Sequence, residues 1–230
     1  MQPMRKLDHV AILKGVPSDE LARLAATCRW RSHAKGTEIL SAATDSTDVV
    51  CLVEGRVRIS IVSAGGREVA FRELAPGASF GELAAIDGHG RSVSVVALEE
   101  CVVAALSRQQ FWGLLERQPK VATLVLQNLA ALVRDLTTRL VETTTLTAPV
   151  RVRIELLRLA REAGVTGNRA CIDRFPFHAD FANRIGATRE AVTRELARLT
   201  RAGLLVHQNA GIAIGDVARL EASIDEVSVD

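Results

Sequence analysis

The chain has 230 residues and a formal net charge of +2, and 48% of its residues are hydrophobic and 24% charged. This composition is typical of a folded protein with one large domain or two modest ones. No apolar stretch reaches the ~18–20 residues of a membrane-spanning helix, and the N-terminus makes a poor signal sequence, so we expect a cytoplasmic protein without a membrane partner. The four cysteines and five histidines are scattered, which argues against a disulfide framework and a metal site.

The segment between about residues 30 and 106 has the composition of a small all-β domain, and a short helix that Ser18 is expected to cap precedes it. Short β-branched runs alternate there with turns such as Gly65-Gly66 and Pro76-Gly77. The run Val57–Ile61 alternates apolar and polar residues, which predicts a half-buried strand.

A helical period follows Pro119 and continues to about residue 146. One apolar stripe has the spacing of a two-stranded coiled coil and predicts a dimer seam, formed by Ala122, Val125, Leu129, Leu132 and Leu136. A second stripe is expected to lie against the β domain and consists of Leu126, Val133 and Leu140. Spacing alone leaves open a helix that is buried within a single chain. Pro149 ends the period and predicts a hinge.

Residues 178–199 have the layout of a helix-turn-helix. Gly186 suits the tight turn, and Thr188 is expected to cap the second helix. That helix has an apolar back formed by Val192, Leu196 and Leu199, and an opposite face that carries Glu190, Arg194, Ala197 and Arg201. Such a face can reach base edges in the major groove. A β-hairpin wing is expected over 204–214, with its turn at 208–211. The alternative is an ordinary helical pair with solvated arginines.

A candidate anion site begins at Phe80-Gly81-Glu82, which follows a Pro-Gly turn and is expected to start a short helix. A helix N-terminus offers free N–H groups to an anion, and Gly81 permits close approach. Arg91 and Ser92 supply a guanidinium, expected to face solvent, and a hydroxyl, while Glu82 could accept from a ribose hydroxyl. The alternative is a structural ion pair between Glu82 and Arg91. No Walker-type loop and no nucleophile–base spacing are present, so we expect no enzymatic activity.

The two motifs, in this order, resemble the cyclic-AMP receptor protein/FNR family of bacterial transcription regulators. The resemblance implies an α+β protein with a cyclic-nucleotide-binding β-roll (a jelly roll) over 1–118, a dimerisation helix over 119–146 and a winged helix-turn-helix over 147–230. It implies a cytoplasmic homodimer that binds double-stranded DNA at TGTGA-like half-sites and contacts RNA polymerase. The implied effector-binding residues are Gly81, Glu82, Leu83, Ala84, Arg91, Ser92, Leu136 and Thr137. The implied DNA-binding residues are Thr188, Arg189, Glu190, Thr193, Arg194 and Arg201.

The chain departs from the family pattern on the long helix, where Leu136-Thr137 stands in place of two adjacent hydroxyl residues and Leu132 in place of an arginine. The base therefore stays open between cyclic AMP, cyclic GMP and both. A regulator with a vestigial pocket, constitutive or responding to redox, gas or another ligand, is the alternative. We expect no metal, haem or iron–sulfur cluster, because only Cys28 lies in the N-terminal region and no histidine has a supporting context.

The near-neutral net charge conceals an uneven distribution. Residues 151–215 carry eleven arginines, no lysine and six carboxylates, whereas residues 216–230 carry one arginine and five carboxylates. The segment with the helix-turn-helix is thus basic, which favours DNA as the partner.

Overall fold

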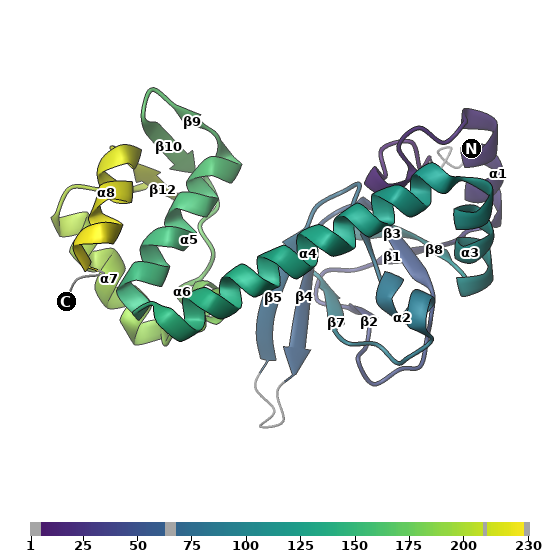
Figure 1. Ribbon diagram of the computed structural model, residues 1–230, viewed down its shortest axis with the longest axis horizontal. Helices are drawn as coiled ribbons and strands as arrows, with labels where there is room; N and C mark the ends of the chain where they lie inside the picture. Colours follow the sequence, from purple (N-terminus) through teal and green to yellow (C-terminus); the bar gives the residue numbers. More distant parts are fainter. Residues whose placement is uncertain (1–5, 63–67, 209–210, 228–230) are drawn as a thin grey trace. The chain divides into compact units, whose positions relative to one another are not determined.

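The structure, a computed structural model, describes residues 6–62, 68–208 and 211–227 (Figure 1). The chain divides into two compact units, residues 1–132 and residues 133–230. Within the described ranges, none of the helices has the length and apolar character needed to cross a membrane.

The first unit begins with a 3-10 turn at Ala11–Leu13 and helix α1 at Ser18–Thr27. Eight strands follow: β1 (Arg29–His33), β2 (Glu38–Leu40), β3 (Val49–Glu54), β4 (Val57–Val62), β5 (Glu68–Leu74), β6 (Ser79–Phe80), β7 (Ser94–Ala97) and β8 (Cys101–Leu106). Helix α2 (Glu82–Asp87) lies between β6 and β7, and helix α3 (Arg108–Arg117) follows β8. The expected all-β segment is confirmed.

Two four-stranded antiparallel sheets form the β domain, with strand orders β1-β8-β3-β6 and β2-β7-β4-β5. Alternation along β3 and β8 sends side chains such as Val50, Leu52 and Val103 into the core between the sheets. Their neighbours Val49 and Cys51 face the opposite way and join a second core with α1, α3 and the start of the next helix.

One local expectation is wrong and another holds in part. Ser18 is the first residue of α1 and makes no capping bond, because Pro17 occupies the cap position. The strand predicted over Val57–Ile61 is confirmed as β4, but its alternation breaks at Ser60, which is buried, because the pairing of β4 with β5 shifts register between Ile59 and Ser60. The predicted turn at Gly65-Gly66 lies outside the described residues.

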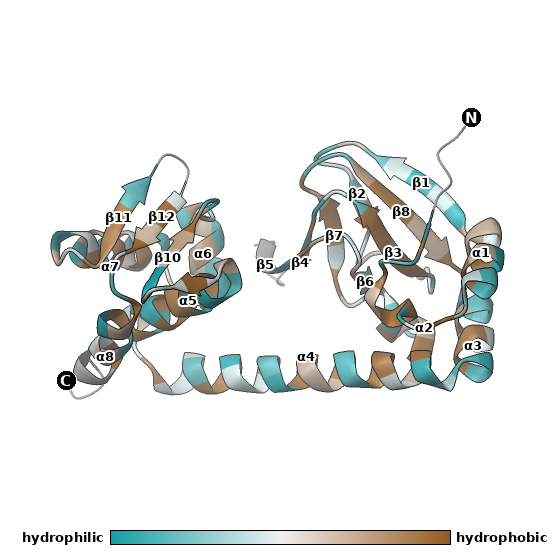
Figure 2. Ribbon diagram, turned by 90° about the horizontal axis from the view of Figure 1, so that it is seen from above, coloured by the Kyte–Doolittle hydropathy of each residue, from teal (hydrophilic) through white to brown (hydrophobic). Residues whose placement is uncertain are grey.

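Helix α4 (Pro119–Thr145) corrects the assignment of the two apolar stripes. Val125 is 5% exposed and Leu129 packs against the same core of the first unit, so this part of the expected dimer seam is covered within one chain. Leu126, the member of the second stripe that belongs to the first unit, does not lie against the β domain, because 66% of its surface is accessible. Val133 and Leu140 belong to the second unit and are exposed there, with 61% and 63% of their surface accessible. Figure 2 shows that apolar residues recur along the whole length of this helix.

The second unit contains the last part of α4, followed by α5 (Ala148–Ala163), β9 (Val165–Thr166), β10 (Arg169–Ile172), α6 (His178–Arg184), α7 (Arg189–Arg201), β11 (Leu205–Gln208), β12 (Gly211–Ile214) and α8 (Val217–Val227). The four strands form one sheet in the order β11-β12-β10-β9. Its core joins α5, α6, α7 and the sheet through Leu156, Phe181, Leu196 and Ile212. The predicted wing is confirmed as β11 and β12, although residues 209–210 of its turn lie outside the described residues.

Candidate functional site

The turn into α2 requires glycine. Gly81 has φ +90°, a left-handed conformation, and stands at the N-cap of α2. A Cβ at this position would collide with the guanidinium of Arg91 and lie 2.7 Å from the carbonyl oxygen of Asp48. The approach of an anion to Gly81 stays a prediction, and in this structure the group that lies against Gly81 is the guanidinium of Arg91.

Arg91 is buried, with 6% of its surface exposed, so the expectation that it faces solvent is wrong. Its Nη1 donates to the carbonyl of Gly81 (2.9 Å), its Nη2 to the carbonyl of Asp48 (2.7 Å) and its Nε to Oγ of Ser46 (3.0 Å). Burial lowers the pKa of Arg91, while Asp48 and Glu82 act in the opposite direction. Three of its five N–H groups thus join the α2 turn to the segment between β2 and β3.

Glu82 is the most unusual group of this cradle. Its Oε2 is buried and has no hydrogen-bond partner among the described residues. Arg91 does not form an ion pair with it, so the alternative of a structural Glu82–Arg91 pair is not found. Burial raises the pKa of Glu82, and hydrogen bonding to its own backbone together with the charges of Arg72 and Arg91 only partly offsets this. A buried acceptor left unpaired is costly, and a donor from a ligand would relieve the cost.

The remaining predicted effector residues are placed differently. Ser92 is exposed, and its hydroxyl has no partner within the described residues. Leu83 is exposed and Ala84 is buried in the first turn of α2. Leu136 and Thr137 belong to the second unit, where the hydroxyl of Thr137 donates to the carbonyl of Val133 (2.9 Å). The structure thus brings together Gly81, Glu82 and Arg91, with Ser92 next in sequence.

The helix-turn-helix forms as its residues predict. Gly186, with φ +61°, occupies the turn between α6 and α7. The hydroxyl of Thr188 accepts from the backbone N–H of Ala191 (3.2 Å), so Thr188 caps α7. The apolar back, formed by Val192, Leu196 and Leu199, is buried in the core.

The outward face of α7 is open to solvent over its whole length. Arg189, Glu190 and Arg194 are exposed, and Arg201 is exposed near the end of the helix. Hydrogen bonds from its own N–H and from the Thr188 hydroxyl, with the charges of Arg189 and Arg194, lower the pKa of Glu190. Glu190 is therefore an ionised acceptor between cations, suited to the amino group of a base.

Thr193 has a partner that sequence reasoning missed. Its hydroxyl lies 2.9 Å from Nδ1 of His178, which begins α6. Burial and the charges of Arg189 and His207 lower the pKa of His178. The pair joins the two helices of the motif on the exposed side, and its spacing of fifteen residues carries no recognisable signal in the sequence.

Not all arginines of the basic segment are available to DNA. Seven of the eleven have acceptors within the second unit: Arg151, Arg153, Arg158, Arg161, Arg184, Arg198 and Arg201. Arg201 donates only to the carbonyl of Ala197 on its own helix and stays exposed. The other four are exposed and form no ion pair with a described residue: Arg169, Arg174, Arg189 and Arg194. The charge that can face DNA is therefore smaller than the sequence count indicates.

Arg151 connects the end of α4 to the turn of the helix-turn-helix. It donates to the carbonyls of Leu146 (2.6 Å) and Thr143 (3.4 Å) and to those of Ile185 (2.8 Å) and Gly186 (2.9 Å). The planar guanidinium has several donors in fixed directions, so one side chain serves both segments. Sequence reasoning missed this role because the partners are backbone carbonyls, which leave no residue-type signal.

A buried ion pair fixes α7 from behind. Nε of Arg153 on α5 donates to Oε1 of Glu195 on α7 (2.8 Å), and both side chains are buried. Arg153 also donates to the carbonyl of Ser223 on α8. Removing either partner would leave a buried charge unpaired.

No cluster of three metal-ligating side chains occurs in the part of the chain that the structure describes.

Known proteins combine these features in the same order. Residues 30–118 match the family model of the cyclic nucleotide-binding domain, and residues 150–223 match that of the Crp-like helix-turn-helix domain. The chain is 28% identical over 210 residues to the cyclic AMP receptor protein of Thermus thermophilus, covering 91% of this chain and 94% of that protein. It is 24% identical over 215 residues to a CRP-like cAMP-activated global transcriptional regulator of Mycobacterium tuberculosis, covering 93% and 96%.

Solved structures share this fold. That of CLP, a c-di-GMP responsive global regulator of Xanthomonas campestris, superposes with a TM-score of 0.73 at 19% identity, covering 86% of this chain and 99% of that chain. A cyclic nucleotide-binding domain followed by a Crp-like helix-turn-helix defines a class of transcription regulators. This chain belongs to the cyclic-AMP receptor protein/FNR family.

Proposed function

We propose that the protein is a homodimeric transcription regulator whose affinity for DNA is controlled by a cyclic nucleotide bound at Gly81, Glu82, Arg91 and Ser92. The proposal of a nucleotide ligand rests on the buried Oε2 of Glu82, which has no partner in the described residues. A ribose hydroxyl is a neutral donor of the right chemistry for that oxygen, and the Arg91 charge lies nearby for the cyclic phosphate.

The roles divide between phosphate and sugar. Two N–H groups of Arg91 remain after its three protein bonds, and the exposed Ser92 hydroxyl and the backbone N–H groups of Leu83 and Ala84 would complete the phosphate site. Glu82 would accept from the ribose. The base would meet Leu136 and Thr137, of which only Thr137 offers a hydroxyl. We therefore leave the base open between adenine and guanine.

The proposed dimer forms through the exposed face of α4. Leu126, Ala130, Val133, Thr137 and Leu140 are exposed and follow one another at four- and three-residue steps, the seam spacing of a two-stranded coiled coil. An apolar stripe of this kind in water favours a second helix as its cover. Thr137 lies on this seam, which would bring the partner subunit close to the effector.

The proposed DNA contact uses α7 in the major groove. Arg189, Glu190 and Arg194 are exposed side by side, and arginine can bind guanine through two hydrogen bonds while glutamate accepts from cytosine. A two-fold dimer would bind a pseudo-palindrome of TGTGA-like half-sites ~34–36 Å apart. Thr188, Thr193 and Arg201 would add contacts at the edges of this surface, and contact with RNA polymerase is implied by the family.

The test follows ligand and DNA together. Calorimetry with cyclic AMP and cyclic GMP is combined with fluorescence anisotropy on a labelled operator. Saturable binding of one nucleotide and a change in operator affinity support the proposal, whereas absence of either contradicts it. Arg194→Ala should lose operator affinity, and Arg219→Ala, an exposed arginine on α8, serves as the matched control.

A second candidate keeps DNA binding and changes the effector. Three N–H groups of Arg91 are already bonded to protein, and Leu136 offers no hydroxyl to a base. These observations favour a regulator that is constitutive or responds to redox, gas or another ligand through a vestigial pocket. Operator binding without any calorimetric response to either nucleotide would select this candidate, and an absorption spectrum of the fresh protein would reveal a haem or cluster.

A further inference from the structure

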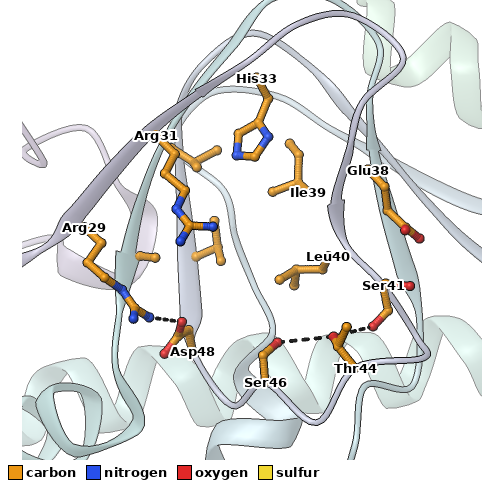
Figure 3. Close-up of a pocket in the computed structure, with 13 residues that line it drawn as sticks. Arg29, Arg31, His33, Glu38, Ile39, Leu40, Ser41, Thr44, Ser46 and Asp48 are labelled. Atoms are coloured by element: carbon orange, nitrogen blue, oxygen red, sulfur yellow. Dashed lines mark hydrogen bonds and ion pairs between the residues drawn. The ribbon is translucent and has the colours of Figure 1, made fainter.

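A pocket of about 380 Å³ lies between the two sheets of the first unit, at the edge formed by β1 and β2 (Figure 3). This volume falls within the range of ~300–1,000 Å³ that is typical of small-molecule sites. The residue that defines the nucleotide cradle, Glu82, does not line it.

Strand β1 gives one wall of the pocket a basic character. Trp30 faces the outer core, so Arg29, Arg31 and His33 project to the opposite, inner side by strand alternation. They stand opposite inward-facing residues of β8, with Arg29 paired to Ala105 and Arg31 to Val103. The apolar inner face of the sheet thus ends in three basic side chains at its edge strand.

Two arginines and two carboxylates line the pocket, but only one arginine of the β1 wall has a carboxylate partner. Arg29 forms an ion pair with Asp48, whereas the guanidinium of Arg31 has no hydrogen-bond or ion-pair partner in the described part of the chain. Figure 3 shows Arg31 and His33 directed into the pocket and the Glu38 carboxylate directed away from them. Burial and the charge of Arg31 lower the pKa of His33. An anion bound between Arg31 and His33 would pair with the guanidinium of Arg31 and would offset the effect of its charge on His33.

The opposite wall supplies hydroxyls and apolar surface. Thr44 and Ser46 lie on the segment between β2 and β3, with their hydroxyl oxygens 3.5 Å apart. Leu40 and Val50 contribute an apolar floor. We propose that this pocket binds a small organic monoanion, a carboxylate on a compact apolar body, with the carboxylate held by Arg31 and His33.

The pocket is separate from the nucleotide cradle but shares a wall with it. Ser46 lines the pocket and also accepts from Nε of Arg91 (3.0 Å), and the carbonyl of Asp48 accepts from the same guanidinium (2.7 Å). The proposal does not depend on nucleotide binding, because none of its ligating groups belongs to Gly81, Glu82 or Ser92.

The test uses benzoate as the probe and benzyl alcohol as its neutral counterpart. The ring protons of His33, assigned by comparison with His33→Gln among five histidines, are followed by NMR in the full-length protein. We expect saturable shifts with benzoate, weaker or no shifts with benzyl alcohol, and a rise in the pKa of His33 on benzoate binding. Equal binding of the two compounds, or no shift with benzoate, would overturn the proposal.

Substitutions test where benzoate binds. Arg31→Ala should lower the affinity for benzoate at least about tenfold. The melting temperature should stay unchanged, because Arg31 has no partner in the described residues to lose. Arg31→Gln repeats the test should the alanine variant fold poorly. Arg23→Ala, an exposed arginine on α1, and Glu82→Gln should both retain wild-type benzoate affinity. Loss of binding in Glu82→Gln would place the probe in the nucleotide cradle and refute a separate site.

Discussion

Replacing Glu82 by glutamine is expected to stabilise the free protein and to weaken the proposed binding of a cyclic nucleotide. The wild-type carboxylate has a buried oxygen without a partner in the described residues. Glutamine keeps the size and shape of the side chain and removes the charge. Glutamine still places a polar atom there, but an unpaired buried charge costs more than the about 1–3 kcal/mol of a neutral group, so removing the charge should raise the unfolding free energy by about 1–3 kcal/mol.

The gain should depend on pH in a defined direction. Burial raises the pKa of Glu82 in the folded protein above its value of about 4.5 in the unfolded chain. The stabilising contribution of the carboxyl group is therefore complete below the unfolded pKa and is lost as the pH rises through the folded pKa. Glutamine does not ionise, so the advantage of the variant should be small in acid and should grow toward neutral pH.

Thermal unfolding measures this advantage. For a chain of this size ~1 kcal/mol shifts the melting temperature by about 2–4 °C, so the expected rise at neutral pH is about 2–12 °C. Glu116→Gln, an exposed position on α3, controls for loss of one negative charge and should leave the melting temperature unchanged.

The same substitution should lower the affinity for the proposed cyclic nucleotide. A hydrogen bond to a charged acceptor contributes about 1.5–3 kcal/mol, so Glu82→Gln should weaken cyclic nucleotide binding by about 10- to 100-fold. Calorimetry at neutral pH measures this loss. The reasoning is refuted by a variant no more stable than the wild type at neutral pH, by a gain that is equal in acid, or by unchanged nucleotide affinity.

Three further substitutions probe the second unit and the dimer. Val133→Glu places a charge on the exposed seam of α4, so sedimentation should find a folded monomer, and a persistent dimer would contradict the proposed seam. Arg194→Ala should lose about 1–3 kcal/mol of discrimination at one base pair in competition binding, whereas equal weakening on every sequence would make Arg194 a phosphate contact. Arg151→Lys keeps the charge but not the planar donors that serve Ile185, Gly186 and Leu146. It should destabilise the second unit by about 1–3 kcal/mol, and an unchanged melting curve would show that these bonds contribute nothing.

Local patterns predicted the elements well because their causes are local. The cap at Thr188, the left-handed Gly186 and the inward residues of α7 are decided within a few positions of sequence. The strand runs of the β domain follow the same rule. At Ser60 the prediction fails, because a shift in register against the neighbouring strand overrides the local alternation.

The rotation of α4 shows what spacing leaves undecided. Two stripes on this helix have helical spacing, and either could face the β domain. The structure covers Val125 and Leu129 within the first unit and exposes Leu126 and Val133. Which stripe is covered depends on how the helix meets the core of α1 and α3, a tertiary fact that periodicity does not contain.

The surroundings of Arg91 show a second limit of sequence reasoning. The motif identified the residue, but its acceptors on Ser46 and Asp48 lie 45 and 43 positions earlier in the chain. Two of its three acceptors are backbone carbonyls, which any residue provides. Burial of this arginine therefore becomes apparent only when the fold brings the two segments together.

The burial of Arg91 affects how mutants of this protein would behave in a genetic selection. Arg91 joins Gly81 to Ser46 and Asp48, so most substitutions there would unpair buried carbonyls and lower the amount of folded protein. A selection for clones that ignore the proposed effector would recover such alleles together with alleles that simply lack folded protein. Substitutions at Glu82 remove a buried charge without a partner in the described residues, so abundant, effector-blind protein should come from that codon.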